Sequence, residues 1–363
     1  DTVAVEAAFL LRETKESEKP AIVRIGDSPL VVFFPTEKLT KLGFLVQGPY
    51  RTTPARDNIP TDDAWNQMLV QETAQLVSSV LGPMKKQGLL TPGCLEALPI
   101  DVESFPPGSM FRPIFDAVKE TLLKEPLLPT EEGGGVAAGN AVMARGSALR
   151  DILDETQLRQ LLSTDRPLKW LVSDITHDRT PALQAYFTDE LGVVELTPDN
   201  VARRMSREFF EMQSDDWFRR FYGFLEGQEA LWREARYSRP EGPLRNLPFI
   251  RLEDGRHEPP FQGDGVPSVY LPLADDTDLP VVKRYITEDK EAMEFLRRLG
   301  LYVPDIVDEV IDNVLPKYSL DGPITPEEHD NDISKLLMAL HSDSTSKRDR
   351  VVQAARQTAC LMG

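Results

Sequence analysis

The sequence predicts an α+β protein, in which an N-terminal α/β unit precedes mostly helical modules with short β-hairpins. Three observations indicate this class. Short β-rich runs fill the first 60 residues, amphipathic helical periods dominate after residue 101, and turns rich in proline or glycine separate these runs. The chain has 363 residues, 41% of them hydrophobic, and single cores stop growing at roughly 250–300 residues, so we expect two or three domains.

The first 100 residues are predicted to form an antiparallel or mixed sheet covered by one helix. Four β-rich runs precede the helix, at 3–11, 21–25, 30–34 and 43–47. Thr61 or Asp62 is the candidate N-cap of the helix, and apolar residues follow at helical spacing. Because glycine and proline disfavour helix interiors, we expect the helix to end at Gly82-Pro83.

The rest of the chain is predicted to be mostly helical. Amphipathic periods occur at 111–124, 148–162, 181–191, 201–212, 215–234, 290–299, 306–314, 326–340 and 346–359. Six aromatic residues between 217 and 232 lie at helical spacing, and we interpret them as core.

A weak internal repeat organises this helical part. Residues 126–133 and 248–255 both run from an apolar strand into an acidic glycine turn, and residues 191–199 resemble 299–305. The repeat predicts the same chain path for 126–200 and 248–314. We therefore expect three domains, comprising residues 1–100, 101–240 and 241–363.

Charge and cysteine usage narrow the function classes. The formal net charge is −18, which repels polyphosphate backbones, so we do not expect nucleic acid as a partner. No apolar run approaches the roughly 18 residues of a membrane span. The two cysteines form no CxxC pair, which is typical of a reducing compartment, so we expect a cytoplasmic protein. Because the chain begins at Asp1, we also expect it to be a segment of a longer protein.

The densest polar chemistry lies in the 14 residues 47–60, between a predicted strand and the helix cap. Arg51 and Arg56 are expected to project from this loop, and the planar guanidinium group matches the oxygens of a phosphate. The structural alternative is that both arginines pair with the three aspartates between residues 57 and 63.

This loop resembles the one that follows the ATP-binding fold in sacsin-type, heat-shock-protein-ninety-like ATPases of the GHKL superfamily, found in large bacterial proteins. Gly48, Thr53, Arg56 and Ile59 stand at the positions where that family has glycine, threonine, arginine and isoleucine. Two flanking segments are also similar to family signatures, namely Trp65-Asn66 at the helix start and Phe33-Phe34-Pro35 at a strand end. The chain departs from the family at Asp57 and Pro60, where a second arginine and a tryptophan often stand.

The resemblance implies a role for residues 1–100 as the middle, or transducer, domain beside an upstream ATP-binding domain of the same chain. It implies that the full-length protein hydrolyses ATP with Mg²⁺ and remodels a protein client, as a chaperone or in defence. It assigns Arg56 as the catalytic residue that senses the γ-phosphate, with Gln47, Arg51 and Thr53 contacting phosphate in support. The family's nucleotide-binding motifs are not found in this chain, so we expect the segment alone to hold no cofactor and to be inactive.

Other functions find weaker support. A non-enzymatic scaffold for protein interactions is the main alternative. The dipeptides His177-Asp178 and His329-Asp330 suggest metal ligands, but their turn-like surroundings favour surface or capping roles. The glycine-rich run 133–139 lacks the Lys-Ser or Lys-Thr of a P-loop, so we expect a hairpin turn there.

Overall fold

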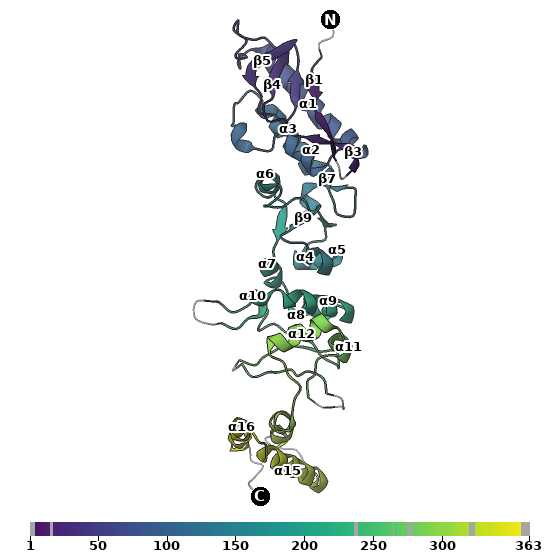
Figure 1. Cartoon of the computed structure of the whole chain (residues 1–363), viewed down its shortest axis with the longest axis vertical. Coiled ribbons are helices and arrows are strands. Elements are labelled where there is room, and N and C mark those ends of the chain that lie inside the picture. Colours follow the sequence, from purple (N-terminus) through teal and green to yellow (C-terminus); the bar gives the residue numbers. More distant parts are fainter. Residues whose placement is uncertain are drawn as a thin grey trace. The chain divides into compact units, whose positions relative to one another are not determined.

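The computed structural model describes residues 4–14, 17–235, 239–263, 265–273, 277, 279–318 and 324–356. It is a mixed α+β structure with several small sheets, as predicted (Figure 1). The chain divides into two compact units, Asp1–Thr197 and Pro198–Gly363, rather than at the expected boundaries after residues 100 and 240. Residue 100 lies inside the first unit because the helices on either side of it share one hydrophobic core.

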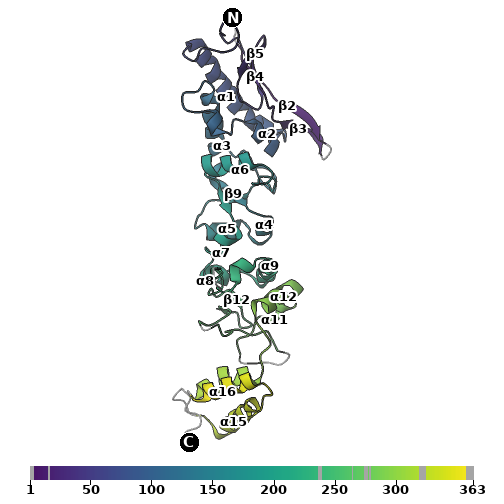
Figure 2. The same cartoon turned by 60° about the vertical axis from the view of Figure 1, so that its left-hand side comes forward.

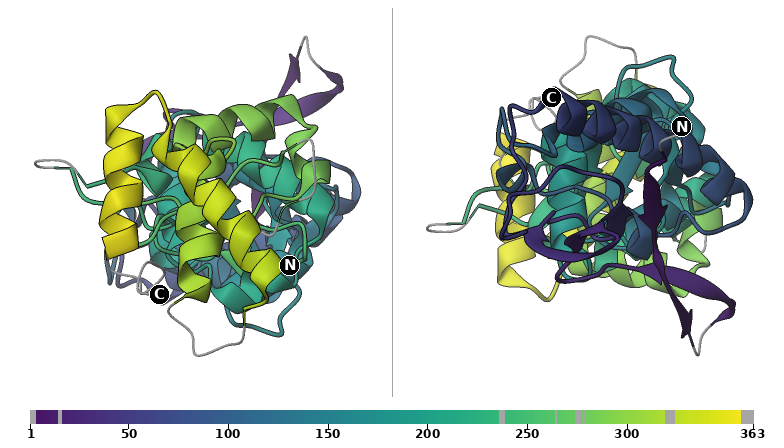
Figure 3. Two further views of the ribbon diagram at one scale, coloured as in Figure 1. Left: turned by 90° about the horizontal axis from the view of Figure 1, so that it is seen from below. Right: turned by 90° about the horizontal axis from the view of Figure 1, so that it is seen from above.

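The first unit begins with six strands and a long helix. The strands are β1 (Glu6–Ala8), β2 (Leu10–Thr14), β3 (Ser17–Val23), β4 (Pro29–Val32), β5 (Phe34–Leu39) and β6 (Leu45–Gln47). Four of them form a mixed sheet in the order β1-β6-β4-β5, in which β6 is antiparallel to β1 and parallel to β4. The other two, β2 and β3, form an antiparallel ribbon that extends from this sheet (Figures 2 and 3).

Helix α1 (Ala64–Lys86) packs against this sheet and against α3 (Arg112–Lys124). Asp63 is its N-cap rather than Thr61 or Asp62, since its carboxylate accepts the first main-chain N–H groups of the helix. The helix also continues through Gly82-Pro83, where the sequence predicted its end. Met84, which lies beyond the proline, is partly buried and packs against the core of this unit, and this packing helps to offset the roughly 3 kcal/mol that an interior proline costs.

The rest of the first unit surrounds a small parallel sheet. Its other elements are α2 (Pro92–Ala97), η1 (Val102–Ser104), β7 (Leu128–Pro129), β8 (Gly135–Val136), η2 (Ala138–Asn140), β9 (Ala141–Ala144), α4 (Ala148–Ile152), α5 (Glu155–Leu161), β10 (Lys169–Trp170), α6 (Pro181–Ala185), the π-helical turn η3 (Tyr186–Glu190) and β11 (Val194–Leu196). The sheet has the order β10-β9-β11, and both neighbours run parallel to β9.

The second unit is mainly helical. It contains α7 (Pro198–Ala202), α8 (Arg207–Glu211), α9 (Asp215–Glu226), α10 (Glu229–Trp232), β12 (Ile250–Arg251), β13 (His257–Glu258), α11 (Arg284–Thr287), α12 (Lys290–Leu299), α13 (Ile306–Glu309), η4 (Val310–Val314), α14 (Leu315–Lys317), α15 (Pro326–Leu340) and α16 (Thr345–Arg356). Helices α15 and α16 pack together (Figure 3). Residues 357–359 of the last predicted helix lie outside the described residues.

Aromatic side chains of α9 form the core of the second unit, as the sequence predicted. Trp217, Phe218, Phe221 and Tyr222 are fully buried and contact further rings of the same unit. Gly227 ends α9, so the predicted helix 215–234 is two helices, α9 and α10.

The two segments of the predicted repeat begin with the same hairpin. Leu128 pairs with Val136 in the first copy, and Ile250 pairs with Glu258 in the second. In both copies, the glycine of the acidic turn donates its main-chain N–H to the carbonyl three residues earlier.

The equivalence continues beyond the hairpins. In each copy, a later segment pairs with the hairpin in antiparallel orientation. The paired residues are Thr130 and Leu171 in the first copy, and Leu252 and Val282 in the second. The same later segment pairs in parallel with the residues that follow the hairpin. This pairing joins Trp170 to Val142 in the first copy and Val281 to Tyr270 in the second. The two copies therefore share the hairpin and these two pairings, whereas α4 and α5 of the first copy have no counterpart among the described residues between Tyr270 and Val281 of the second.

Candidate functional site

The polar loop 47–60 leads from the end of β6 to α1, as the sequence predicted. Arg51, Thr53 and Arg56 lie within it, whereas Gln47 is the exposed last residue of β6 and pairs with Glu6 of β1.

Arg56 connects this loop to the turn between β4 and β5. Its Nη2 donates to the main-chain carbonyls of Val32 and Phe34, at 2.8 and 3.0 Å. Its own carbonyl accepts from the N–H of Glu37 at 3.1 Å. The backbone of Arg56 has a φ of 62°, a left-handed conformation that non-glycine residues adopt at a cost. Arg56 is thus held in a specific position by contacts 20 or so residues away in sequence.

Arg51 is the more exposed of the two arginines. Its side chain is 65% exposed, and its Nη1 lies 3.1 Å from Oδ2 of Asp63. The guanidinium group lies 5.7 Å from the centroid of the Trp65 ring. The main-chain N–H of Asn66 lowers the pKa of Asp63, and Arg51 lowers it further. The contact with Asp63 is the local pairing that the structural alternative predicts for Arg51.

Thr53 stabilises the middle of the loop. Its hydroxyl donates to Oδ1 of Asp57 at 2.5 Å, and this hydrogen bond lowers the pKa of the Asp57 carboxyl. The main chain of Thr53 also exchanges hydrogen bonds with Asn58 and Arg56. Asp57, one of the two positions at which the loop differs from the family pattern, therefore accepts a hydrogen bond within the loop.

Two side chains at the start of α1 hold the main chain of the loop. Asn66 is fully buried; its Oδ1 accepts from the N–H of Arg51 at 2.8 Å, and its Nδ2 donates to the carbonyls of Arg51 and Pro60 at 2.9 and 3.2 Å. The indole N–H of Trp65 donates to the carbonyl of Pro49 at 2.9 Å. The sequence indicated Trp65-Asn66 only as a helix start, and its part in fixing the loop was missed.

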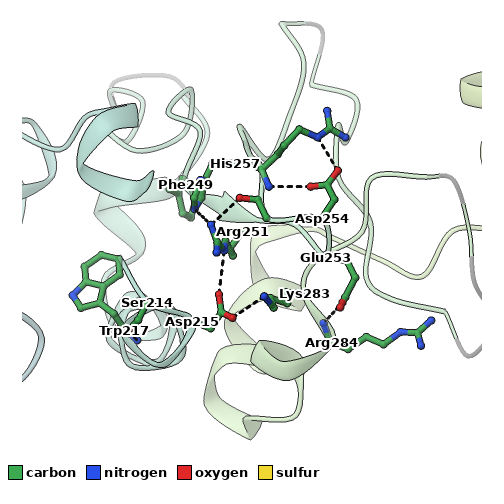
Figure 4. Close-up of polar contacts among 12 residues, drawn as sticks. Ser214, Asp215, Trp217, Phe249, Arg251, Glu253, Asp254, His257, Lys283 and Arg284 are labelled. Atoms are coloured by element: carbon green, nitrogen blue, oxygen red, sulfur yellow. Dashed lines mark hydrogen bonds and ion pairs between the residues drawn. The ribbon is translucent and has the colours of Figure 1, made fainter. Parts of the chain in front are cut away.

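A second polar centre lies in the second unit, where α9, β12 and the start of α11 meet (Figure 4). Asp215 accepts from Nε of Arg251 at 3.1 Å and from Nζ of Lys283 at 2.7 Å. Nη1 of Arg251 lies 3.4 Å from Nε2 of His257 and also donates to the carbonyl of Gly255. These contacts join two helices to the repeat hairpin.

His257 is the buried titratable group of this centre. It is 2% exposed, and its pKa is lowered to about 4, because burial disfavours the imidazolium ion and Arg251 and Arg207 repel it. Folded His257 therefore stays neutral while the unfolded chain, with a pKa of 6.5, takes up a proton.

We expect this difference to make the second unit less stable at acid pH. As the pH falls from 6.5 towards 4, the unfolded state binds the extra proton, so the free energy of unfolding should fall by up to about 1.4 kcal/mol per pH unit. Urea unfolding at pH 7 and pH 5 should show a smaller pH-dependent loss in His257→Gln than in the wild type. Equal losses in both proteins would show that His257 does not cause the effect.

The metal interpretation gains no support from the described residues. No group of three or more His, Cys, Asp or Glu side chains among them could hold a metal ion. His177 and Asp178 have side chains 77% and 98% exposed, in agreement with a surface role. None of the described helices is long and apolar enough to cross a membrane.

Comparison with known proteins finds no matching family model, no similar curated protein and no similar solved structure.

Proposed function

We propose that residues 1–100 are the middle, or transducer, part of a GHKL-type ATPase. In this proposal, the 47–60 loop approaches the γ-phosphate when an upstream ATP-binding domain of the same chain closes. The supporting observation is that the fully buried Asn66 side chain hydrogen-bonds to the main chain of the loop and fixes its position. The loop so fixed carries two arginines. A fixed main chain lowers the entropy cost of placing a cation against a phosphate.

Arg56 can take the catalytic role only if it leaves the carbonyls of Val32 and Phe34. Those two hydrogen bonds are donated by a charged group at a partly exposed site and are worth roughly 1.5 kcal/mol each. An arginine that stabilises a phosphoryl-transfer transition state contributes roughly 10³–10⁵-fold in rate, or about 4–7 kcal/mol. The exchange is therefore favourable once the nucleotide is enclosed, and we keep Arg56 as the proposed catalytic residue.

The same two hydrogen bonds favour the alternative function, a non-enzymatic interaction scaffold in which Arg56 only stabilises the β4–β5 turn. The coding sequence upstream of Asp1 separates the two proposals. An ATP-binding domain with a helical Asn and an Asp-x-Gly-x-Gly motif is expected there. An unrelated domain would contradict the ATPase proposal and favour the scaffold.

The segment of 363 residues should not hydrolyse Mg²⁺-ATP alone, because the groups that hold adenine and the metal would lie upstream. Phosphate release should equal the buffer background, and the full-length protein assayed in parallel is the positive control. Steady turnover by the segment would place a complete nucleotide site within it and contradict the proposed division of roles.

A further inference from the structure

A large pocket opens at the carboxyl edge of the parallel sheet in the first unit. Strand β9 is first in sequence and central in space, with β10 on one side and β11 on the other. The connection from β9 leads to β10 on one side of it, and the next connection crosses to β11 on the other side. In parallel α/β sheets, ligands bind at such a point, outside the carboxyl ends of the strands. The pocket has a volume of about 670 Å³ and is lined by the segments that follow β9 and β10, together with Glu195 of β11. This volume is within the usual range for small-molecule sites.

The wall of this pocket contains a buried cation that is incompletely paired. The side chain of Arg150 on α4 is only 10% exposed. Its Nε has no hydrogen-bond acceptor among the described residues, and the nearest carboxylate oxygen, on Glu131, is 4.0 Å away. Its Nη2 makes one long bond of 3.4 Å to the carbonyl of Leu171. Burial lowers the pKa of Arg150 more than the charges of Glu131 and Asp151 raise it, so the buried guanidinium group is incompletely compensated, and an anion in the pocket would offset this cost.

Polar donors lie beside this arginine. Ser147 immediately precedes α4, and within the described part of the chain its hydroxyl makes no capping bond to that helix. Ser173 and Thr176 add two hydroxyl groups to the lining. The backbone of Gly146 has a φ of 90°, which turns the chain sharply between β9 and α4.

The carboxylates at the pocket do not cancel this positive character. Glu195 already accepts from Arg145 at 2.8 Å and from Gln184 at 3.2 Å. The side chain of Asp178 is 98% exposed, so solvent screens its charge. Arg145 and Arg179 also line the pocket, but they pair with Glu195 and Asp174, so Arg150 is the lining arginine whose Nε has no acceptor among the described residues.

We propose that this pocket binds the phosphoryl group of a small molecule, with Arg150 as the anchoring residue and Ser147 as a second donor. A guanidinium group can donate two parallel hydrogen bonds to a phosphate, and hydroxyl groups can donate to its remaining oxygens. The site is separate from the 47–60 loop and does not depend on the function proposed for that loop.

The test is a titration of the 363-residue chain with inorganic phosphate, at constant ionic strength maintained with potassium chloride. The Arg150 guanidinium group lies 5.7 Å from the Trp170 ring centroid, so Trp170 fluorescence should report binding. We expect a saturable fluorescence change and a higher unfolding temperature with phosphate than with chloride, because binding to the folded state alone stabilises it. Trp170→Phe should lose the fluorescence change but keep the thermal shift.

Arg150→Met removes the charge but retains much of the apolar stem, and it should weaken phosphate binding at least about tenfold. Arg203→Met is the matched control, since this arginine pairs with Asp199 and lies outside the pocket lining. Circular dichroism checks the fold of each variant. If Arg150→Met does not fold, Ser147→Ala replaces it, with an expected weakening of several-fold.

Glycerol phosphate, titrated in parallel, distinguishes an ester from free phosphate as the natural ligand. Tighter binding of the ester assigns the pocket to an ester, and equal binding assigns it to inorganic phosphate. The proposal is overturned if folded wild-type protein shows no saturable response to either ligand. It is also overturned if binding is unchanged in the folded Arg150 variant, or in Ser147→Ala when that variant replaces it.

Discussion

Arg56→Ala is expected to lower ATP turnover of the full-length protein by roughly 10²–10⁴-fold, the range measured for groups that stabilise transition-state charge. The affinity for ATP should change far less, because adenine and the metal ion would be held by the upstream domain and Arg56 would act only after closure. Steady-state kinetics should therefore show a fall in kcat with little change in KM.

The structural role of Arg56 requires separate controls. Loss of its bonds to Val32 and Phe34 should also lower the free energy of unfolding by about 1–3 kcal/mol, measured by urea denaturation. Arg56→Lys should restore turnover incompletely, since an ammonium group keeps the charge but not the planar fork. Arg51→Ala should have the milder effect on turnover.

Two outcomes would revise the proposal. If turnover collapses with Arg51→Ala but survives Arg56→Ala, the loop assignment stands and the catalytic residue is Arg51, the more exposed arginine. If neither variant slows a folded enzyme, the loop is structural and the scaffold proposal is favoured.

Asn66→Ala is expected to cause the second large effect, on stability and turnover together. The substitution removes a buried amide that satisfies the N–H and carbonyl of Arg51 and the carbonyl of Pro60. Leaving these groups without their partner should lower the free energy of unfolding of the first unit by about 2–4 kcal/mol. Turnover of the full-length protein should also fall, although the residue would never touch nucleotide, because the loop would lose its fixed main chain.

The neighbouring Gln67 provides the matched control. Its side chain donates one exposed hydrogen bond to the carbonyl of Thr61 at 2.9 Å, so Gln67→Ala should change stability by less than about 1 kcal/mol. Hydrogen exchange should show faster exchange of the loop amides in Asn66→Ala than in Gln67→Ala. Equal exchange in both variants would show that Asn66 does not hold the loop.

Sequence patterns over a few residues predicted many of the helices and hairpins but often misplaced where the helices begin or end. The acidic glycine turns marked both hairpins of the repeat, because turn chemistry acts over a few residues. The predicted helix 148–162 is interrupted because the Asp154 side chain accepts from the N–H of Gln157 and starts α5 anew. Helix α1 passes its predicted end because distant packing partners outweigh the local effect of Pro83.

The composition of the 47–60 loop singled it out as a candidate site, but the partners of its arginines could not be predicted. The Val32 and Phe34 carbonyls that Arg56 contacts lie 24 and 22 residues away in sequence. The sequence did not indicate Arg150 as a site residue, because its burial and its unsatisfied Nε exist only after β9, β10 and α4 have packed together.

The sequence by itself determined the α+β class, the early strands apart from β5 and the division of 3–11 into β1 and β2, helix α1, the aromatic core stripe and the two hairpins of the repeat. Each of these depends on periodicity or turn residues within a short window. Only the tertiary structure decided that residues 1–197 form one unit, that Asn66 holds the arginine loop, and that a pocket opens beside β9. These features depend on burial and on hydrogen bonds between residues far apart in sequence, whose geometry a local pattern does not specify.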